Sequence, residues 1–408
     1  MKKRIIIVGG GFGGITAMHA LKKQLGHKVD VVLIDFRTTT LNKPRLPDVA
    51  IKGENVEHVR FLMKNAVKQD GYLLIQETVL KIDALAKKVY LKEGGIESYD
   101  YLVLSPGIEK HYSGIDGFRE YGYSVCDDVQ APRLWRKLQS FKGGPVYIGS
   151  MPYKSGTRVN VPKLLAPCEG PVGEIMFILN DFLKKKGLED SSTITAFSPA
   201  KIFFEDVGEK VRNDVGKIMK DEGIGLITEK TVRKLDANHI YFTDGTKEKC
   251  ALAIILPEYK PYDFIIKSGL GDDAGFIPTD EQMRHLDFPE IFAVGDATSL
   301  SVPKLGHIAV IQANIAAKTI ANELGKKVKI PKFDPAVLCI MERSNYQATM
   351  IYSNVLYNGK LDETIDGYVA FGMKWSFDFY YNFTRGHMPP EFAERVLVNH
   401  LNKKTKKL

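Results

Sequence analysis

Short apolar runs alternate with amphipathic stretches over the first three quarters of the chain. The run Arg4–Val8 stops at a group of glycines, a helical pattern follows from about Phe12 to Gln24, and a second apolar run, Val29–Ile34, ends at Asp35. Two apolar strands joined by an amphipathic helix form a βαβ unit, which places both strands in a parallel sheet. Three further strands are predicted in this part, at 72–76, 87–91 and 99–105.

A second series with the same alternation begins near Pro145. Its predicted strands are 145–149, 193–198, 226–228, 239–242 and 251–256, and its predicted helices are 172–186 and 209–222. The first pattern then returns at Ile291–Val294, followed by a helix from about Gly306 to Leu324. After this helix the chain becomes rich in aromatic residues.

These patterns predict an α/β fold with two Rossmann-like dinucleotide-binding domains. The first domain is predicted to be discontinuous, at 1–115 and 263–324, and the second to span 116–262. Residues 325–408 are predicted to form a C-terminal α+β unit, rich in aromatic residues, that faces a membrane.

The composition is that of a globular protein and narrows the function by exclusion. Its 57 lysines and arginines against 49 acidic residues give a net charge of +8, a moderate excess that suits anionic ligands or an anionic membrane surface. No nucleic-acid-binding motif accompanies this charge. The 4 cysteines include no CxxC pair, so neither a disulfide scaffold nor a metal site is expected. Without a signal-like segment or an apolar run of ~20 residues, the chain is expected to fold in the cytosol and to contact a membrane only peripherally.

The glycines of the first unit have the spacing of a dinucleotide-binding loop. Gly9 permits a tight turn, Gly11 lets a pyrophosphate approach the backbone, and Gly14 lets the helix pack closely on the strand. Asp35, roughly 20 residues further on, ends the second strand, where a carboxylate can bind a ribose hydroxyl. A glycine-rich turn without a ligand would explain the glycine triplet alone. It would not explain the strand before the triplet, the helix after it and the acidic residue at the end of the second strand, so a bound dinucleotide is predicted.

Two later motifs indicate which dinucleotide is bound. Ile291–Ala297 resembles the second FAD motif of the pyridine nucleotide–disulfide reductase superfamily, and Tyr101–Gly107 resembles the strand-to-turn element that precedes it. The resemblance implies that Asp296 binds the ribityl chain, with Gly295 and Gly107 in the adjoining turns. It also implies that the next helix points its positive end at the flavin, where it favours the anionic reduced form.

The second series lacks the features that a nicotinamide cofactor would need. Superfamily members that use NAD(P)H repeat the glycine triplet at the start of the second domain. Here Pro145–Gly149 supplies a strand and one glycine, and Met151, Pro152 and Tyr153 stand where the backbone cradle would be. The reductant is therefore expected to be a small molecule that enters by another route.

Three cysteine-containing motifs narrow the resemblance to one family. Cys168 lies in Cys-Glu-Gly-Pro just before a predicted helix, Cys126 ends the segment Tyr-Gly-Tyr-Ser-Val-Cys, and Cys339 lies beyond the flavin domain. Together with Val302–Gly306 and the C-terminal aromatic segment, these motifs resemble the sulfide:quinone oxidoreductases, of the archaeal kind, over nearly the whole chain.

The resemblance implies a role for each of these residues. Cys168 and Cys339 would be the redox pair, with Cys339 next to the flavin and Cys168 carrying the growing sulfur chain. Cys126 would hold the FAD 8-methyl carbon as a thioether, and Lys304 would lie near the flavin. The chemistry agrees, because sulfide can open a disulfide to give a persulfide and a thiolate, provided that the two cysteines are close enough to bridge.

Other polar residues have structural alternatives. Cys250, on an apparent strand, is interpreted as a buried apolar filler. The helix that follows Cys168 is expected to lower the pKa of its thiol. Glu169 either relays protons or interacts with the helix N-terminus, and both alternatives stay open; for Glu174 the helix interaction is preferred. His307 is interpreted as a structural residue at a helix start, although proton transfer is an alternative.

The C-terminal segment suits a lipid-borne electron acceptor. Trp375–Phe383 is dense in aromatic residues, Pro390–Leu401 has the pattern of an amphipathic helix, and lysines 403, 404, 406 and 407 follow. An apolar helix face beside a lysine cluster suits peripheral attachment to an anionic leaflet, although an ordinary packed helix would show the same pattern. The candidates to enclose a quinone ring are Tyr346, Phe379 and Phe383.

The sequence therefore predicts an FAD enzyme, without a metal, that oxidises sulfide to polysulfide or sulfur and reduces a membrane quinone. It is expected to work as a peripheral protein on the cytoplasmic side of the cell membrane, as a homo-oligomer. Two rival enzymes are a type II NADH:quinone oxidoreductase and the flavoprotein subunit of a flavocytochrome c sulfide dehydrogenase. A non-enzymatic flavin-bearing protein is a third alternative, which the retained cysteine pair disfavours.

Overall fold

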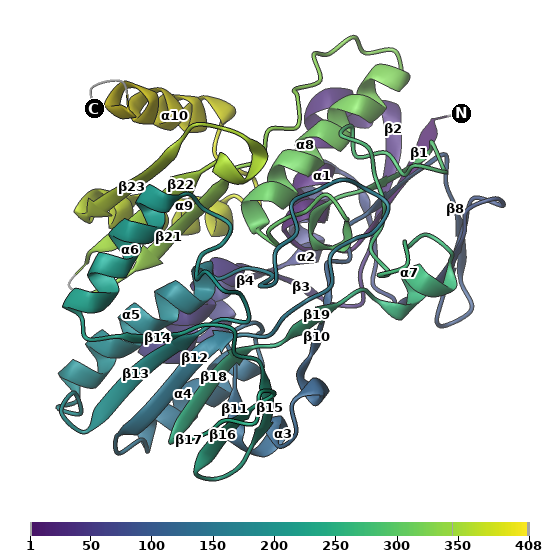
Figure 1. Cartoon of the computed structure of the whole chain (residues 1–408). Coiled ribbons are helices and arrows are strands. Elements are labelled where there is room, and N and C mark those ends of the chain that lie inside the picture. The colour runs from purple at the N-terminus through teal and green to yellow at the C-terminus, as the bar shows by residue number, and fades with distance from the viewer. Residues whose placement is uncertain (1, 345, 406–408) are drawn as a thin grey trace.

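A parallel five-stranded sheet organises the first half of the molecule (Figure 1). The computed structural model describes residues 2–344 and 346–405, without the side chains of Glu391 and of residues 403–405. The strand order is β20-β9-β1-β2-β5. The bounds of these strands are β1 Lys3–Val8, β2 Val29–Ile34, β5 Leu73–Ile75, β9 Tyr101–Leu104 and β20 Ile291–Ala293.

The register of this sheet brings three loops to one edge. Val8 pairs with Leu104, and Leu104 pairs with Ala293, so β1, β9 and β20 end side by side. Their successors in the chain are the segments that begin at Gly9, Ser105 and Val294. In an open parallel sheet, ligands bind outside the carboxyl ends of the strands, and these three segments line that position.

Two long helices cover one face of the first sheet. α1 (Phe12–Leu25) packs against α8 (Gly306–Glu323), and both contribute to one buried apolar cluster with β1 and β2. The short helix α2 (Met63–Asp70) borders this cluster, and α7 (Asp263–Lys267) lies against the antiparallel sheet β6-β7-β8. The bounds of that sheet are β6 Val79–Asp83, β7 Lys88–Leu91 and β8 Ile96–Ser98.

A second parallel sheet, in the order β11-β18-β12-β13-β14, forms the second half. Its strands are β11 Gly122–Tyr123, β12 Gly144–Ser150, β13 Ser192–Phe197, β14 Gly225–Ile227 and β18 Leu252–Leu256. The helices α4 (Gln130–Gln139), α5 (Gly170–Lys185) and α6 (Glu209–Asp221) share its core. An antiparallel sheet completes it, with β15 Val232–Leu235, β16 His239–Phe242 and β17 Lys247–Lys249.

Shorter elements connect the two halves. β10 (Glu109–His111) pairs with β19 (Glu258–Lys260), and β3 (Thr39–Leu41) pairs with β4 (Arg60–Leu62), all antiparallel. Helix α3 (Phe118–Tyr121) precedes β11. Single helical turns occupy Gly26–Lys28, Lys43–Arg45, Asp48–Lys52, Val56–Val59, Tyr112–Gly114, Gly295–Ala297 and Val355–Tyr357.

The C-terminal unit is a small α+β layer above the second sheet, yellow in Figure 1. The antiparallel strands β21 (Val337–Glu342), β22 (Ala348–Ser353) and β23 (Asp362–Gly367) carry the helices α9 (Tyr368–Phe383) and α10 (Glu391–Thr405). β21 packs on α5, and β23 packs on α6. The start of α5, which follows Cys168, is therefore held against the strand that carries Cys339.

The predicted strands and helices of both α/β series are confirmed, with ends that shift by one or two residues. The predicted α/β fold with Rossmann-like parallel sheets is also confirmed, whereas the domain limits stay an interpretation. The sequence did not identify the three strands of the C-terminal unit or α9 as a helix. Among the described residues, no helix is long and apolar enough to cross a membrane.

Candidate active site

The first glycine loop has the close contacts that only glycine allows. Gly9 has a φ of +99°, and a Cβ on it would lie 2.3 Å from the carbonyl oxygen of Ser105. A Cβ on Gly14 would lie 1.8 Å from the carbonyl oxygen of Gly9. A Cβ on Gly11, by contrast, would meet nothing within 4 Å. The loop is therefore closed toward the sheet and open at Gly11, the position where a pyrophosphate approaches the backbone.

Asp35 holds this loop in place from the end of β2. Its Oδ2 accepts a hydrogen bond from the backbone N–H of Gly10 at 2.6 Å, and its Oδ1 accepts one from the N–H of Arg37 at 2.7 Å. Burial raises the pKa of Asp35, although these bonds and the Arg37 charge oppose the shift. The carboxylate lies beside the open glycine position and suits a ribose hydroxyl there.

The second predicted FAD motif lies at the same edge of the sheet. Gly295 has a φ of +77°, and its N–H donates to Oε1 of Gln312, on α8, at 2.7 Å. This bond fixes the turn that presents Asp296, which is partly exposed. At the end of β9, Gly107 has a φ of +72°, and a Cβ there would meet nothing within 4 Å. The cradles at both ends of the site therefore fit an FAD.

Cys168 and Cys339 are brought together where α5 meets β21. A Cβ placed on Gly170 would lie 2.8 Å from Sγ of Cys339 and 3.9 Å from Sγ of Cys168. Both cysteines are free thiols, and Cys168 is buried. Residues 171 positions apart thus share one small space, as a redox pair requires.

Burial governs the acidity of both thiols. It raises the pKa of Cys339 to about 12 and that of Cys168 well above the ordinary value. The expectation that the helix after Cys168 lowers its pKa is therefore wrong, because desolvation outweighs the hydrogen bond from the N–H of Gly170. Both groups are neutral thiols near pH 7 in this state.

Lys304 connects the cysteine loop to the second FAD motif. Its backbone N–H donates to the carbonyl oxygen of Pro167 at 2.8 Å, and its ammonium donates to the carbonyl oxygen of Thr298 at 2.9 Å. The ammonium also lies 4.2 Å from the centre of the Phe276 ring. Burial lowers the pKa of Lys304 to about 7, while the charge of Asp296 opposes this shift.

Two buried carboxyl groups lie near Cys168, one next to it in the chain and one brought to it by the fold. Glu169 is 1% exposed, and its Oε2 accepts a hydrogen bond from the N–H of Phe204 at 2.6 Å. Burial raises the pKa of Glu169 to about 8 and that of Asp206 to about 7. The charge of Asp206 also raises the pKa of Cys168. No local motif marks Asp206, which reaches the cysteine only through the loop between β13 and α6.

A buried charge network lies next to Cys339. Lys374, on α9, forms an ion pair with Glu174, on α5, and lies 3.8 Å from Glu342 at the end of β21. Lys52 pairs with Glu342 and, at 2.8 Å, with Asp48. Burial raises the pKa of Glu174 to about 7. The preferred helix-end role of Glu174 is wrong, because its carboxylate binds the Lys374 ammonium instead.

Cys126 lies on the side of the site that faces β19. Its Sγ is 3.8 Å from the hydroxyl of Tyr259. Burial raises the pKa of Tyr259, and the charges of Cys126, Cys168 and Asp296 raise it further. Burial also lowers the pKa of Lys110 to about 8, with opposing contributions from Cys126 and Asp296. Tyr259 and Lys110, which were not predicted from the sequence, thus lie close to both Cys126 and Asp296.

The three predicted quinone residues are not together. Phe379 and Phe383 stack on the outer face of α9, 5.7 Å apart, and are 59% and 75% exposed. Tyr346 lies in the turn between β21 and β22, against Phe371 at 5.5 Å. Phe371 precedes Phe379 by eight residues, about 12 Å along a helix. The structure therefore brings two of the three candidates into contact and leaves Tyr346 separate.

The remaining predictions concern structural residues. Cys250 is 7% exposed in an apolar cluster, just before β18, as its filler role requires. His307 lies 3.2 Å from Glu394 of α10, which joins the start of α8 to the C-terminal unit. The lysines predicted to form a basic tail, at 403, 404, 406 and 407, lie outside the described side chains.

The family model of the pyridine nucleotide-disulphide oxidoreductases matches residues 3–142 and 186–313. The chain belongs to this family. The matched residues include both predicted FAD motifs and exclude Cys168 and Cys339, so the family alone does not decide the chemistry of the cysteines. FAD follows from the family and from the fit of the cradles described above.

Individual relatives point in a narrower direction. The mitochondrial sulfide:quinone oxidoreductase of Dictyostelium discoideum is 24% identical over 388 residues, 89% of this chain and 79% of the relative. A sulfide-quinone reductase of Aquifex aeolicus is 24% identical over 97% of this chain and 95% of its own. The X-ray structure of the sulfide:quinone oxidoreductase from Aquifex aeolicus superposes with a TM-score of 0.85, at 22% identity, and covers 97% of this chain and 94% of that one.

A relative from another enzyme class also matches. A type II NADH:quinone oxidoreductase of Staphylococcus haemolyticus is 21% identical and covers 79% of this chain and 83% of its own. In this chain, buried side chains occupy the start of the second parallel sheet, where a second dinucleotide would need an open glycine loop. Met151 and Tyr153 are buried in two apolar clusters, and a Cβ on Gly149 would lie 2.2 Å from the carbonyl oxygen of Phe197.

Proposed function

We propose that this protein is a sulfide:quinone oxidoreductase, which oxidises sulfide to polysulfide or sulfur and passes the electrons through FAD to a membrane quinone. The observation that supports this most directly is the pairing of Cys168 and Cys339 around Gly170. Lys304 and Tyr259 connect this pair to Asp296 of the second FAD motif. The match to the relatives named for this activity extends over most of the length of each relative.

The cysteine pair supplies the sulfur chemistry. In the oxidised pair, the hydrosulfide ion attacks Sγ of Cys168, the bond between the two cysteines breaks, and Cys339 leaves as a thiolate. The product is a persulfide on Cys168. The two electrons that leave with Cys339 are the ones that the cofactor must accept. That Cys339, and not Cys168, faces the flavin rests on the family resemblance.

The buried carboxyl groups supply and hold protons at each cysteine. Glu169, with a pKa of about 8, keeps its proton at pH 7, so no carboxylate charge next to Cys168 in the chain repels the incoming hydrosulfide ion. On the other side, Lys374 places an ammonium near Cys339 that lowers the pKa of this thiol, but burial and the charge of Glu174 raise the pKa and prevail.

The cofactor would be held by the backbone at Gly11, by the carboxylates of Asp35 and Asp296, and by the turns at Gly107 and Gly295. When bound, FAD accepts an electron pair and returns it to a quinone. NADH is disfavoured as the reductant because buried side chains fill the second cradle.

The decisive experiment is anaerobic mixing of the purified flavoprotein with sulfide, and separately with NADH, while the visible flavin absorbance is recorded. Sulfide is expected to bleach the flavin, a soluble quinone to restore it, and NADH to leave it unchanged. Cys339→Ser is expected to abolish the bleaching by sulfide. Cys250→Ser is the matched control, because it removes a buried cysteine outside the site.

The opposite result would establish the NADH:quinone activity instead. If NADH bleaches the flavin and sulfide does not, the cysteine pair is structural. If Cys250→Ser loses sulfide reduction as completely as Cys339→Ser, the effect comes from folding and not from the pair.

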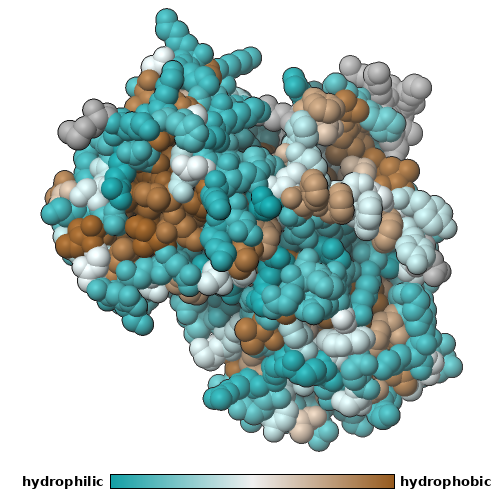
Figure 2. All heavy atoms as spheres, turned by 180° about the vertical axis from the view of Figure 1, so that it is seen from behind, coloured by the Kyte–Doolittle hydropathy of each residue, from teal (hydrophilic) through white to brown (hydrophobic). Residues whose placement is uncertain are grey.

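We further propose that the quinone and the membrane meet the outer face of α9. Trp375, Phe379 and Phe383 stack along this face with ring centres 5.7 Å apart, and Phe392 of α10 is 60% exposed. Figure 2 shows apolar side chains over the C-terminal unit at its upper right. Apolar side chains also gather at the left of Figure 2, so hydropathy alone does not identify the surface that meets the membrane. The continuous row of aromatic side chains on α9 favours the C-terminal unit.

We also propose that Cys126 carries FAD covalently, as the resemblance implies. The support is that Sγ of Cys126 lies 3.8 Å from the hydroxyl of Tyr259. The charge of Asp296, in the second FAD motif, also raises the pKa of Tyr259. Denaturing gel electrophoresis with flavin fluorescence tests this link. Fluorescence should migrate with the wild-type chain and not with Cys126→Ser; a fluorescent Cys126→Ser band would disprove the link.

Three finer assignments are proposed on the resemblance alone. They are attachment at the cytoplasmic face of the cell membrane, a homo-oligomeric state and the archaeal kind of the family. Membrane fractionation and light scattering of the detergent-extracted protein test the first two.

A further inference from the structure

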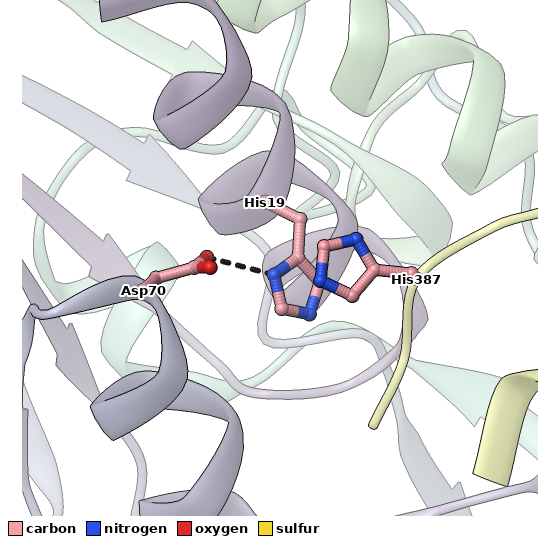
Figure 3. Close-up of side chains that lie close together, drawn as sticks. All are labelled: His19, Asp70 and His387. Carbon is pink, nitrogen blue, oxygen red and sulfur yellow. Dashed lines mark hydrogen bonds and ion pairs between the residues drawn. The ribbon is translucent and has the colours of Figure 1, made fainter. Parts of the chain in front are cut away.

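A cluster of two histidines and one aspartate lies outside the site described above (Figure 3). His19 comes from the middle of α1, Asp70 from the last turn of α2, and His387 from the segment between α9 and α10. One ligand atom from each residue lies within 4.8 Å of the other two. Three separate segments therefore converge at one point between the flavin domain and the C-terminal unit.

His19 is oriented as metal-binding histidines are. Its Nε2 lies 3.0 Å from the carbonyl oxygen of Arg385, and its Nδ1 lies 2.7 Å from Oδ2 of Asp70. Metal-bound histidines usually donate their second ring N–H to a backbone carbonyl or a carboxylate, which fixes the tautomer and the ring. The Arg385 carbonyl does this here and directs Nδ1 toward Asp70.

The other two residues complete a set of nitrogen and oxygen donors. Asp70 is 4% exposed, and Lys22 bonds to its backbone carbonyl, at 2.6 Å, and not to its carboxylate. His387 is partly exposed, and its ring stacks on that of His19 with centres 3.6 Å apart. The cluster is therefore reachable from solvent on one side, and a water could take a fourth position there.

We propose that His19, Asp70 and His387 form a binding site for a divalent transition-metal ion of the zinc class. Two imidazoles and a carboxylate are donors that Zn²⁺ accepts in tetrahedral sites. The ion replaces the one proton shared by Nδ1 of His19 and Oδ2 of Asp70, so binding releases that proton to solvent.

The three donor atoms must move closer together to bind one ion. Donor atoms around tetrahedral zinc are about 3.3 Å apart, whereas the three donors here spread over as much as 4.8 Å. His387 lies on the segment between two helices and outside both, so its ring can turn toward the other donors. The expected consequence is that the ion ties this segment, and with it the C-terminal unit, to α1.

The test is zinc binding by the purified, EDTA-treated flavoprotein. After equilibrium dialysis against Zn²⁺ alone, the metal content is measured by mass spectrometry for the wild type, for His387→Gln and for His58→Gln. His58 is an exposed histidine outside the cluster and is the matched control. We expect the wild type and His58→Gln to hold one zinc ion per chain more than His387→Gln.

Only the difference between variants counts, because cysteine thiols also bind zinc. Asp70→Asn keeps the shape of the side chain but replaces the carboxylate donor by an amide, and it should lose the same ion. A second measurement is the protection of residues 384–390 from proteolysis, which zinc should increase in the wild type alone. Equal zinc content in the wild type, His387→Gln and Asp70→Asn would overturn the proposal and leave the cluster as an ion pair with a stacked ring.

Discussion

Gly170 leaves room for the sulfur of Cys339: a Cβ on the glycine would lie 2.8 Å from that sulfur atom. The same Cβ would be 3.9 Å from the sulfur of Cys168. The first position of α5 is therefore a spacer between the helix and the redox pair, and its size decides where the two sulfurs lie.

Gly170→Ala is expected to displace Cys339 and to slow flavin reduction by sulfide by about tenfold or more, because small misplacements of reacting groups are costly. The flavin content should not change, because Gly170 lies outside both predicted FAD motifs. Stopped-flow absorbance measures the rate. Gly216→Ala, on the exposed face of α6 where a Cβ would meet nothing within 4 Å, is the control and should stabilise the helix by about 0.5–1 kcal/mol. An unchanged sulfide rate in Gly170→Ala would show that the pair tolerates the methyl group.

Glu169 is expected to set the alkaline limit of the sulfide reaction. Burial raises its pKa to about 8, so the carboxyl is protonated at pH 7 and ionises as the pH rises. The rate of sulfide-dependent flavin reduction should fall above about pH 8, because a carboxylate beside Cys168 opposes negative charge on sulfur. Glu169→Gln cannot ionise and should lack this fall, while its rate at pH 7 stays within about tenfold.

The difference in stability between the wild type and Glu169→Gln should change with pH as Glu169 ionises. The folded pKa of Glu169 lies above its unfolded value, so the buried charge destabilises the wild type fully above about pH 8 and not at all well below the unfolded pKa. Glu169→Gln should therefore gain thermal stability over the wild type at pH 9 and lose that advantage at pH 5. A gain of the same size at both values would show that Glu169 does not titrate in this range.

The chain pattern predicted the two parallel sheets because most of their strands are mainly apolar runs between turn residues. Within these runs, Ile5–Val8 and Val31–Ile34 are buried without a break, and the glycines after the first run are needed for contacts such as the one between Gly14 and Gly9. At these positions the residues that favour a strand or a turn locally are also the residues that the packed fold requires. The two FAD motifs could be predicted for the same reason.

The C-terminal unit could not be predicted in this way. In α9, Tyr381 is fully buried against Phe12, at 4.6 Å, whereas Phe379 and Phe383 are exposed, so aromatic residues occupy both faces and no apolar period marks the helix. Its inward lysine, Lys374, is meaningful only because Glu174 lies opposite, 200 residues away in the chain. Pairings over such separations depend on the packed fold and leave no local signal.

Lys374 is expected to be one of the most sensitive positions for stability. It is 6% exposed, and Lys374→Met would leave the carboxylates of Glu174 and Glu342 buried without their shared cation. Breaking a buried pair on one side costs about 3–5 kcal/mol. Chemical denaturation measures this loss, and the double variant with Glu174→Gln should lose less than the two single losses together.

The control for this prediction is the ion pair between the exposed Lys185 and the partly buried Asp181, one turn apart on α5. Lys185→Met should cost no more than about 0.5 kcal/mol. A loss in Lys374→Met as small as that in Lys185→Met would mean that the buried carboxyl groups simply take up protons.

The aromatic row on α9 is expected to anchor the protein to lipid. Phe379 and Phe383 stack in the open, and fully burying one such side chain gains about 1.5–3 kcal/mol. Replacing both by serine should lower the fraction bound to anionic liposomes by about tenfold or more, as measured by co-sedimentation. Flavin reduction by sulfide in solution should be unchanged, because neither ring contacts the cysteine pair.

Leu85→Ser separates this effect from a general loss of exposed hydrophobicity. Leu85 is 88% exposed in the turn between β6 and β7, away from the C-terminal unit, and its replacement should leave liposome binding unchanged. If the double serine variant binds liposomes like the wild type, then α9 does not carry the membrane contact. If it loses binding and also raises the KM for a long-chain quinone, with the KM for a short soluble quinone unchanged, then the acceptor reaches the flavin through the same surface that meets the lipid.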